Sequence, residues 1–257
     1  MNCGTQRLCA WTAPVIAVMF FIGLMIAGFL PPLDPGLSAE QLAQVFLAHP
    51  ERIRIGLLIC LLGSGLTGPL VAVIAVQLKR IEGQHSPLTY AQLVLGVFIP
   101  IVIMLPLSWW MTAAYRADRD PQAIQVLSDQ GWMWFVGCLY PAATQWTCIG
   151  IAILRDTADR PVFPRWLGYL NLWCAAGSLP AVGIYFVKSG PFAWNGVLSW
   201  WLPVTVFGVW LLAMFYGLLT AIGEQERTRP TEVAASPDVD QIAARVIELM
   251  QERQTQP

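Results

Sequence analysis

Six long stretches without a charged side chain constrain this chain more than any other feature of its sequence. A membrane-spanning helix needs roughly 17–25 apolar residues, because each residue rises 1.5 Å through a hydrocarbon core about 30 Å thick. The 15 Lys and Arg and the 16 Asp and Glu all lie outside these stretches. The sequence therefore predicts an all-α integral membrane bundle of six transmembrane helices, over residues 13–30, 55–78, 89–114, 131–154, 166–187 and 196–222.

Other fold classes fit the pattern poorly. Charged residues make up only 12% of the chain, against about 25% in an ordinary soluble domain, so a water-soluble globule is disfavoured. A transmembrane strand barrel would show short segments of alternating hydrophobicity, which are missing from the sequence. The first stretch exceeds the 7–15 apolar residues of a signal peptide, and Pro31 and Pro32 follow it without an A-x-A site. We therefore expect it to remain as the first span.

The short loops between the spans carry an unequal number of Lys and Arg residues. Eight lie on the side of the N-terminus and five on the other side. Because cytoplasmic loops carry the excess, we expect both termini in the cytoplasm, with external loops at 31–54, 115–130 and 188–195. Within the first external loop, residues 38–49 predict a short interfacial helix. Ser38 would be its N-cap, Gln41 its third residue, and Leu42, Val45 and Phe46 one apolar face.

The composition changes after the sixth stretch. We expect a transmembrane domain over residues 1–222, a polar linker over 223–235 and a cytoplasmic amphipathic helix over 236–257. Apolar residues of the last segment recur at spacings of three and one, which favours a helix with one apolar stripe. Only Arg245 and Arg253 are basic there, whereas helices on membrane surfaces usually carry many Lys and Arg. The stripe is therefore expected to pack on protein, either its own bundle or a partner chain.

Residues for metal, haem or nucleic-acid binding are not grouped in this chain. The six Cys form no C-x-x-C motif, and the two histidines, His49 and His85, fall in loops on opposite faces. The net charge of −1 and the lack of a basic run disfavour nucleic-acid binding. No Walker A, dinucleotide, H-E-x-x-H or G-x-S-x-G motif occurs. We therefore expect no cofactor and no metal site.

The interior of the predicted spans has no ionisable carboxylate, lysine, arginine or histidine near its middle. Pumps and proton-coupled transporters usually need such groups, so these functions are disfavoured. Polar residues such as Gln145 and Asn171 are expected to form hydrogen bonds between helices. At least one proline falls in each of the second to sixth spans. These prolines are read either as ordinary helix irregularity or as kinks that open the bundle around a cavity.

Tryptophan is unevenly distributed along the predicted depth of the membrane. Seven of the 12 fall at or beside the expected external ends of the spans. One interpretation is an interfacial belt, since Trp anchors membrane proteins at that depth. The other is an aromatic pocket that opens to the external face, to which the same loops add polar groups. The candidate ligand-binding residues are Trp109, Trp110, Arg116, Trp132, Trp134, Lys188, Trp194, Asn195, Trp200 and Trp201.

Asp129 is the candidate catalytic residue. It precedes Trp132 and Trp134 where a span is expected to begin, so its carboxyl would be partly desolvated. Desolvation raises the pKa of a carboxyl and suits it to act as a general acid, while aromatic faces stabilise a cation held over them. Arg116 or Lys188 could instead pair with Asp129 and keep it ionised. A further alternative is that Asp129 simply caps the N-terminus of the helix.

Three short segments carry a resemblance to known proteins. Residues 28–32 (GFLPP), 161–166 (PVFPRW) and 190–196 (GPFAWNG) resemble a group of small bacterial six-span inner-membrane proteins. The resemblance covers most of residues 10–222. It implies a bacterial inner membrane as the location, and it implies no activity and no catalytic residue.

Three classes of function remain open from the sequence. The first is binding of an apolar or amphipathic small molecule in an aromatic pocket near the external face. The second is a membrane-embedded enzyme that acts on a lipid, terpenoid or steroid by acid–base chemistry at Asp129. The third is an accessory subunit of a membrane complex, which would dock a protein partner or a second copy through residues 236–257. The bilayer lipid itself is a partner in all three.

Overall fold

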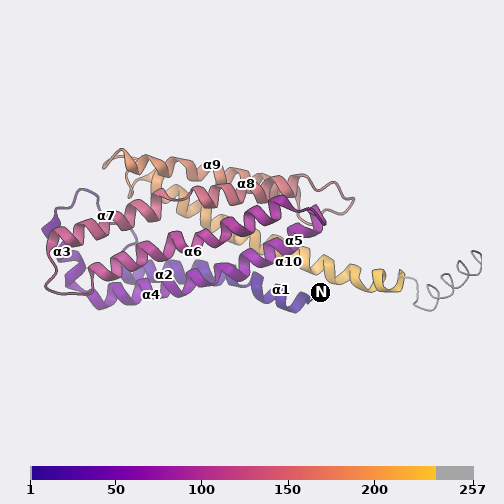
Figure 1. Cartoon of the computed structure of the whole chain (residues 1–257), viewed down its shortest axis with the longest axis horizontal. Helices are drawn as coiled ribbons and strands as arrows, with labels where there is room; N and C mark the ends of the chain where they lie inside the picture. The colour runs from indigo at the N-terminus through magenta and orange to yellow at the C-terminus, as the bar shows by residue number, and fades with distance from the viewer. Residues whose placement is uncertain (1, 236–257) are drawn as a thin grey trace, which may run out of the picture.

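The computed structural model describes residues 2–235, which form helices and connecting segments and contain no strand. Within these residues, six helical spans are long and apolar enough to cross a membrane, which confirms the expected all-α membrane bundle. Because the number of spans is even, the N-terminus and the end of the last helix lie at the same end of the bundle (Figure 1). The spans are Cys3–Ala27, Pro50–Glu82, Pro87–Ala113, Pro121–Leu154, Arg165–Tyr185 and Val197–Thr228.

Most of the spans are built from two helical pieces. One or two residues interrupt the first, second and fourth spans, and segments of 3₁₀ and π geometry occur in the fifth and sixth. The elements are α1 (Cys3–Ala10), α2 (Thr12–Ala27), α4 (Pro50–Gly65), α5 (Thr67–Glu82), α6 (Pro87–Ala113), α7 (Pro121–Gly137), α8 (Tyr140–Leu154), α9 (Arg165–Ser178), the 3₁₀ helix η1 (Leu179–Tyr185), the π-helix η2 (Val197–Trp201) and α10 (Leu202–Ala235).

The short helix predicted at residues 38–49 is confirmed as α3 (Ala39–Ala48). The Ser38 hydroxyl accepts a hydrogen bond from the Gln41 backbone N–H at 3.3 Å, and the Gln41 side chain accepts one from the Ser38 N–H at 2.9 Å. These two bonds form a capping box, which satisfies two donors at the helix start. Val45, which was expected on the apolar face, is exposed, and Ala43 is buried together with Leu42 and Phe46. These three residues form the buried face of α3, which packs against α7.

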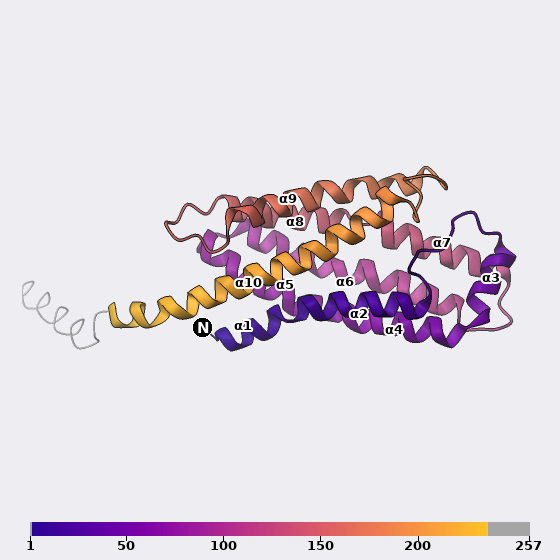
Figure 2. The same ribbon diagram turned by 180° about the vertical axis from the view of Figure 1, so that it is seen from behind.

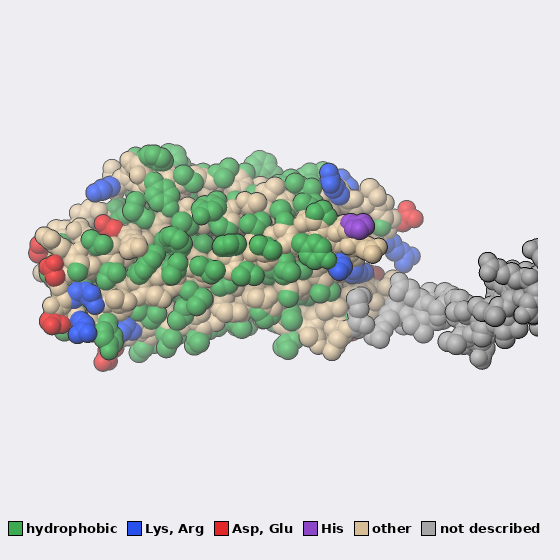
Figure 3. All heavy atoms as spheres, in the orientation of Figure 1, with side chains coloured by type: hydrophobic (Ala, Val, Ile, Leu, Met, Phe, Trp, Pro, Cys, Tyr) green, Lys and Arg blue, Asp and Glu red, His purple; other side chains and the backbone are tan. Residues whose placement is uncertain are grey.

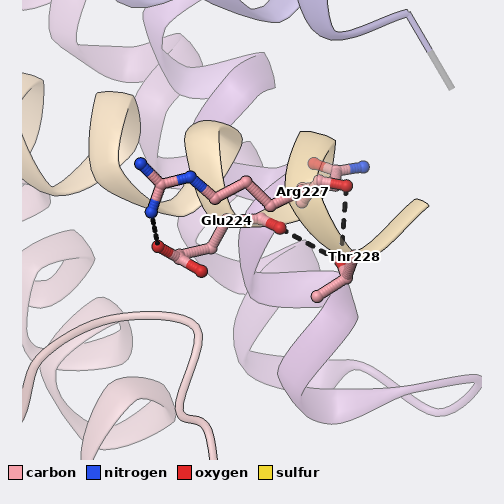
Figure 4. A network of polar contacts seen from close by, with 4 residues as sticks. Glu224, Arg227 and Thr228 are labelled. Atoms are coloured by element: carbon pink, nitrogen blue, oxygen red, sulfur yellow. Dashed lines mark hydrogen bonds and ion pairs between the residues drawn. The ribbon is translucent and has the colours of Figure 1, made fainter. Parts of the chain in front are cut away.

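The predicted linker at residues 223–235 is helical instead, because α10 continues without a break to Ala235. Figure 4 shows local contacts along this extension: Arg227 forms an ion pair of 3.0 Å with Glu224, and the Thr228 hydroxyl donates to the Glu224 carbonyl at 3.0 Å. Pairs of opposite charge at this spacing stabilise helices. Arg7 of α1 also contacts Glu226 at 2.7 Å. The helix predicted at 236–257 lies outside the described residues.

A buried amide network joins α1, α5 and α10 near the N-terminal end of the bundle. The Gln77 amide is fully buried and donates to Gln6 at 2.5 Å and to Gln225 at 3.2 Å. Arg80 donates in turn to the side-chain amide oxygen of Gln77 at 2.6 Å. Since unpaired amides are costly in an apolar interior, these bonds fix the extension of α10 against the other two helices.

The surface agrees with placement in a membrane. In Figure 3, hydrophobic side chains cover the middle of the visible face, and charged side chains gather at its two ends. Below, the end that carries α3 and the start of α7 is called the distal end, and the end with the N-terminus is called the proximal end (Figure 1). The expected external loops lie at the distal end. Which end faces the cytoplasm stays a prediction.

Candidate functional site

Several tryptophans singled out from the sequence meet in a packed cluster at the distal end. We call Phe29, Phe46, Trp110, Trp132, Phe135, Trp194 and Trp200 the distal cluster. Trp132 lies at its centre. The centroid of its ring lies 4.6 Å from that of Trp110, 5.4 Å from that of Trp200 and 6.4 Å from that of Trp194. Offset, tilted and edge-on ring pairs at such separations are favourable beyond their buried area.

The side chains of the distal cluster are packed closely, and the rings at its centre are buried. Trp110 and Trp132 are both 0% exposed. The Trp110 indole N–H donates to the Ser128 carbonyl at 3.2 Å, and the Trp194 indole N–H donates to the Leu33 carbonyl at 2.8 Å. Gly131 allows the close packing of α7 on α6, because a Cβ atom at this position would collide with the Trp110 ring. These indoles act here as core residues.

The remaining candidate binding residues do not belong to this cluster. Trp109 and Trp134 are partly buried and form an edge-to-face pair at 5.8 Å, while Trp201 is exposed. Such positions are typical of an interfacial tryptophan belt. The candidates in the distal loops are Arg116 and Lys188, which are exposed, and Asn195, which is partly buried.

Asp129 lies in the middle of a helix and not at its start. Because α7 begins at Pro121, with Asp120 at the N-cap position, the interpretation of Asp129 as a cap is wrong. The helix begins earlier than the uncharged stretch because Ile124 and Ser128 are buried where it packs against its neighbours. Asp129 is partly buried, and its carboxyl interacts electrostatically with the positive charge of Lys188. A role for Asp129 as an acid stays a prediction.

A cavity of about 380 Å³ lies next to the distal cluster, inside the bundle. Helices α2, α6, α8 and α10 contribute apolar side chains to its wall, among them Leu24, Ile103, Trp146 and Phe207. Trp200 and Phe135 belong both to the distal cluster and to the wall, so the two regions share a boundary. Of the predicted binding residues, Trp200 is the one that lines the cavity.

Irregular backbone explains why this part of the bundle is open. The fourth span is interrupted between α7 and α8, just before Pro141, and the sixth begins with a π-helix just before Pro203. Proline lacks a backbone N–H and cannot continue the regular hydrogen-bond ladder, so helices bend at such points. Both prolines line the cavity. Gly208 lines it too, and a Cβ atom there would meet no atom within 4 Å.

A second group of rings lies where Trp146 and Phe207 line the cavity. We call Trp146, Phe207 and Trp210 the proximal cluster, whose ring centroids lie 5.5 to 6.5 Å apart. The Trp210 indole N–H donates to the Asn171 side-chain oxygen at 2.8 Å, which fixes the ring. The cavity therefore lies between two packed aromatic clusters.

The wall of the cavity is almost entirely apolar. Its polar side chains are few: Ser199 already donates to the Phe192 carbonyl at 2.9 Å, and the Cys138 thiol lies 3.5 Å from the Tyr185 hydroxyl. No charged side chain among the described residues lines it. Within residues 2–235, no group of three His, Cys, Asp or Glu could hold a metal ion. Such a cavity suits binding by shape and dispersion rather than acid–base chemistry.

The chain matches no protein-family model, no curated protein and no solved structure. The resemblance of residues 28–32, 161–166 and 190–196 to bacterial membrane proteins therefore stays a prediction. The function has to be argued from the cavity itself. Sequence reasoning missed most of its wall, and it left open whether the prolines of the second to sixth spans are ordinary helix irregularity or kinks around a cavity.

Proposed function

We propose that this multi-pass membrane protein binds an apolar small molecule in the cavity between the two aromatic clusters. The observation that carries the proposal is an apolar, preformed space of about 380 Å³ inside the bundle. Sites for small molecules commonly have volumes of about 300–1,000 Å³ and walls of mostly hydrophobic and aromatic side chains. The volume favours one compact molecule or one hydrocarbon chain.

Binding in this place would depend on packing. A molecule already dissolved in lipid gains little from leaving water, so its affinity must come from dispersion contacts with the wall. Rigid rings such as Trp146 and Trp200 supply many contacts without losing conformational freedom. The site would therefore select its ligand by shape, and a charged group would be rejected from the apolar space.

The binding function is favoured over the enzyme alternative by the position of the acid. Asp129 is not among the residues that line the cavity. An acid that protonates a substrate has to reach the reacting atom within hydrogen-bond distance or through one water. None of the described Asp, Glu, His, Lys or Arg residues lines the cavity to perform an acid–base reaction there. The accessory-subunit alternative depends on residues 236–257, which lie outside the described part of the chain.

The cavity proposal is tested by asking what copurifies with the protein. We expect mass spectrometry of a lipid extract to find a defined apolar molecule at a fixed ratio to the protein. Gly208→Phe would place a ring inside the cavity, in space where a Cβ atom meets nothing within 4 Å. The matched control is Gly223→Phe, on the same helix, also with open space around it but away from the cavity wall.

The two variants separate the outcomes. Gly208→Phe should remove the copurified molecule and Gly223→Phe should keep it, while both fold and unfold at temperatures close to that of the wild type. Retention of the same molecule by a folded Gly208→Phe protein would contradict binding in the cavity. Lipid extracts that match the bulk membrane in composition would argue against a defined ligand.

We also propose the inner membrane of a bacterium as the location, with both termini in the cytoplasm. The excess of Lys and Arg at the proximal end supports this orientation. Single cysteines at Gln84 and Gln122, in a background without native cysteines, test it by thiol labelling of intact cells. We expect an impermeant reagent to label position 122 and not 84, and the reverse result would invert the topology.

A further inference from the structure

The two ends of the cavity are closed by aromatic side chains. Toward the distal end, Trp132 and Trp200 are 0% and 1% exposed and are packed against each other. Trp146 and Trp210 are each 2% exposed and pack together in the proximal cluster. A molecule in water at either face of the membrane would have to displace fully buried indoles to reach the cavity.

The side of the cavity between α2 and α10 is different. Phe21 of α2 and Val204 of α10 both line the cavity, and yet they are 58% and 40% exposed. In Figure 2, α10 starts beside α9, crosses toward α1 and lies progressively farther from α2 toward the distal end. The wall of the cavity thus continues onto the outer surface between these two helices.

The outer surface around this opening belongs to the membrane-facing part of the bundle. On α2, one turn to either side of Phe21, the exposed side chains of Val18 and Met25 are apolar, and Val209 farther along α10 is apolar and exposed as well. Phe21 and Val204 themselves lie within spans that are long and apolar enough to cross the bilayer. The opening would therefore face lipid chains rather than water.

We infer that the cavity is loaded sideways from the bilayer, between α2 and α10, with an uncharged molecule rich in hydrocarbon. This inference rests on the proposed binding function and adds a route and a ligand class to it. A molecule that moves from the lipid past Phe21 and Val204 exchanges one apolar environment for another and exposes no charge on the way. A charged headgroup would have to stay outside, because no charged side chain among the described residues lines the wall.

The test uses the full chain in vesicles of phosphatidylethanolamine and phosphatidylglycerol. The probe is a long-chain alcohol with a photoreactive diazirine on its chain, and labelled residues are mapped by peptide mass spectrometry. We expect label on wall residues such as Phe135, Trp146 and Trp200. A second arm uses phosphatidylcholine with the same diazirine on one acyl chain. Wall label from the alcohol alone supports an uncharged apolar molecule. Label from both arms would show that the acyl chain of a lipid with a charged headgroup enters the cavity, which would overturn the proposed ligand class.

The route is tested by changing the bulk of the opening. Val204→Trp should slow labelling of the wall about tenfold, equivalent to about 1.4 kcal/mol of added barrier. Phe21→Ala, on the other rim, should speed it. Val209→Trp is the matched control on α10, since Val209 is exposed but does not line the cavity, and its labelling rate should equal that of the wild type.

Failure of the route can be told apart from failure of the binding proposal. If wall residues are labelled in the wild type but Val204→Trp and Phe21→Ala leave the rate unchanged, the molecule reaches the cavity by another path and the lateral route is wrong. If the wall of the wild-type protein stays unlabelled at the longest times, while lipid-facing residues of α2 are labelled, the cavity is not a binding site and both proposals fail.

Discussion

The distal cluster and the cavity beside it are built from the same kinds of residue, but the first is filled by side chains and the second leaves an open space. Both contain tryptophan and phenylalanine, and Trp200 and Phe135 belong to both. In the cluster, α6 and α7 approach closely at Gly131 and the rings fill the space between them. At the cavity, the fourth span is interrupted and a π-helix precedes α10, and the side chains leave a space of about 380 Å³.

The comparison separates two roles of an aromatic side chain. A ring fills a core where regular helices can approach, and it lines a pocket where prolines and helix breaks prevent that approach. The glycines show the same difference: added bulk at Gly131 meets the Trp110 ring, whereas added bulk at Gly208 meets open space. The regularity of the backbone, rather than the number of tryptophans, decides which region can hold a ligand.

The largest expected effect is that of Trp132→Ala, at the centre of the distal cluster. Removal of a fully buried indole that contacts several other rings should lower the free energy of unfolding by about 3–5 kcal/mol. Thermal unfolding in mild detergent measures it, with Trp201→Ala as the exposed control that should change little. A Trp132→Ala protein of unchanged stability that had lost its ligand would make the cluster a binding pocket after all.

The two glycines provide the next test, because the same substitution should act with opposite sign. Gly131→Ala should destabilise the protein by about 1–3 kcal/mol, since the added methyl group collides with the Trp110 ring. Gly208→Ala should stabilise it by about 0.5–1 kcal/mol, because alanine restricts the unfolded chain and meets no clash in the helix. Equal effects at both sites, in unfolding curves measured side by side, would remove the contrast between closed cluster and open cavity.

A smaller effect is expected at the boundary of the two regions, where Tyr185 of η1 supports the end of α7. Its hydroxyl donates to the Met133 carbonyl at 3.2 Å, just before the break that opens the cavity. Tyr185→Phe keeps the ring and should cost about 0.5–1.5 kcal/mol of stability. Tyr169→Phe, on the exposed surface of α9, is the control. If the bond holds the break in shape, the apolar ligand should also bind more weakly; unchanged binding would show that the break keeps its shape without the bond.

The smallest effect should come from Asp129→Asn. Asp129 lies outside the cavity wall, and interactions between partly exposed charges, such as that of Asp129 with Lys188, contribute at most about 1 kcal/mol. We therefore expect stability within that range and unchanged ligand content in the lipid extract. Loss of the ligand in a stable Asp129→Asn protein would instead bring this carboxyl into the binding path and revive the acid–base alternative.

The sequence by itself determined the membrane bundle, its six spans and the capped helix α3. These features depend on local rules: the length of an uncharged stretch has to match the bilayer, and Ser38 and Gln41 satisfy the helix start from within the same few residues. The helical extension of α10 was missed, because Gln77 and Arg7, far away in the sequence, help to hold it.

Only the tertiary structure decided which tryptophans pack in a core, which line a cavity, and where that cavity lies. Trp110, Trp132 and Trp200 come from three different spans, and their spacing along the chain does not tell whether their rings touch or leave a space. That depends on how closely the helix backbones approach, which Gly131 permits in one place and the breaks before Pro141 and Pro203 prevent in another. Packing of this kind is a property of facing helices, and no single stretch of sequence contains it.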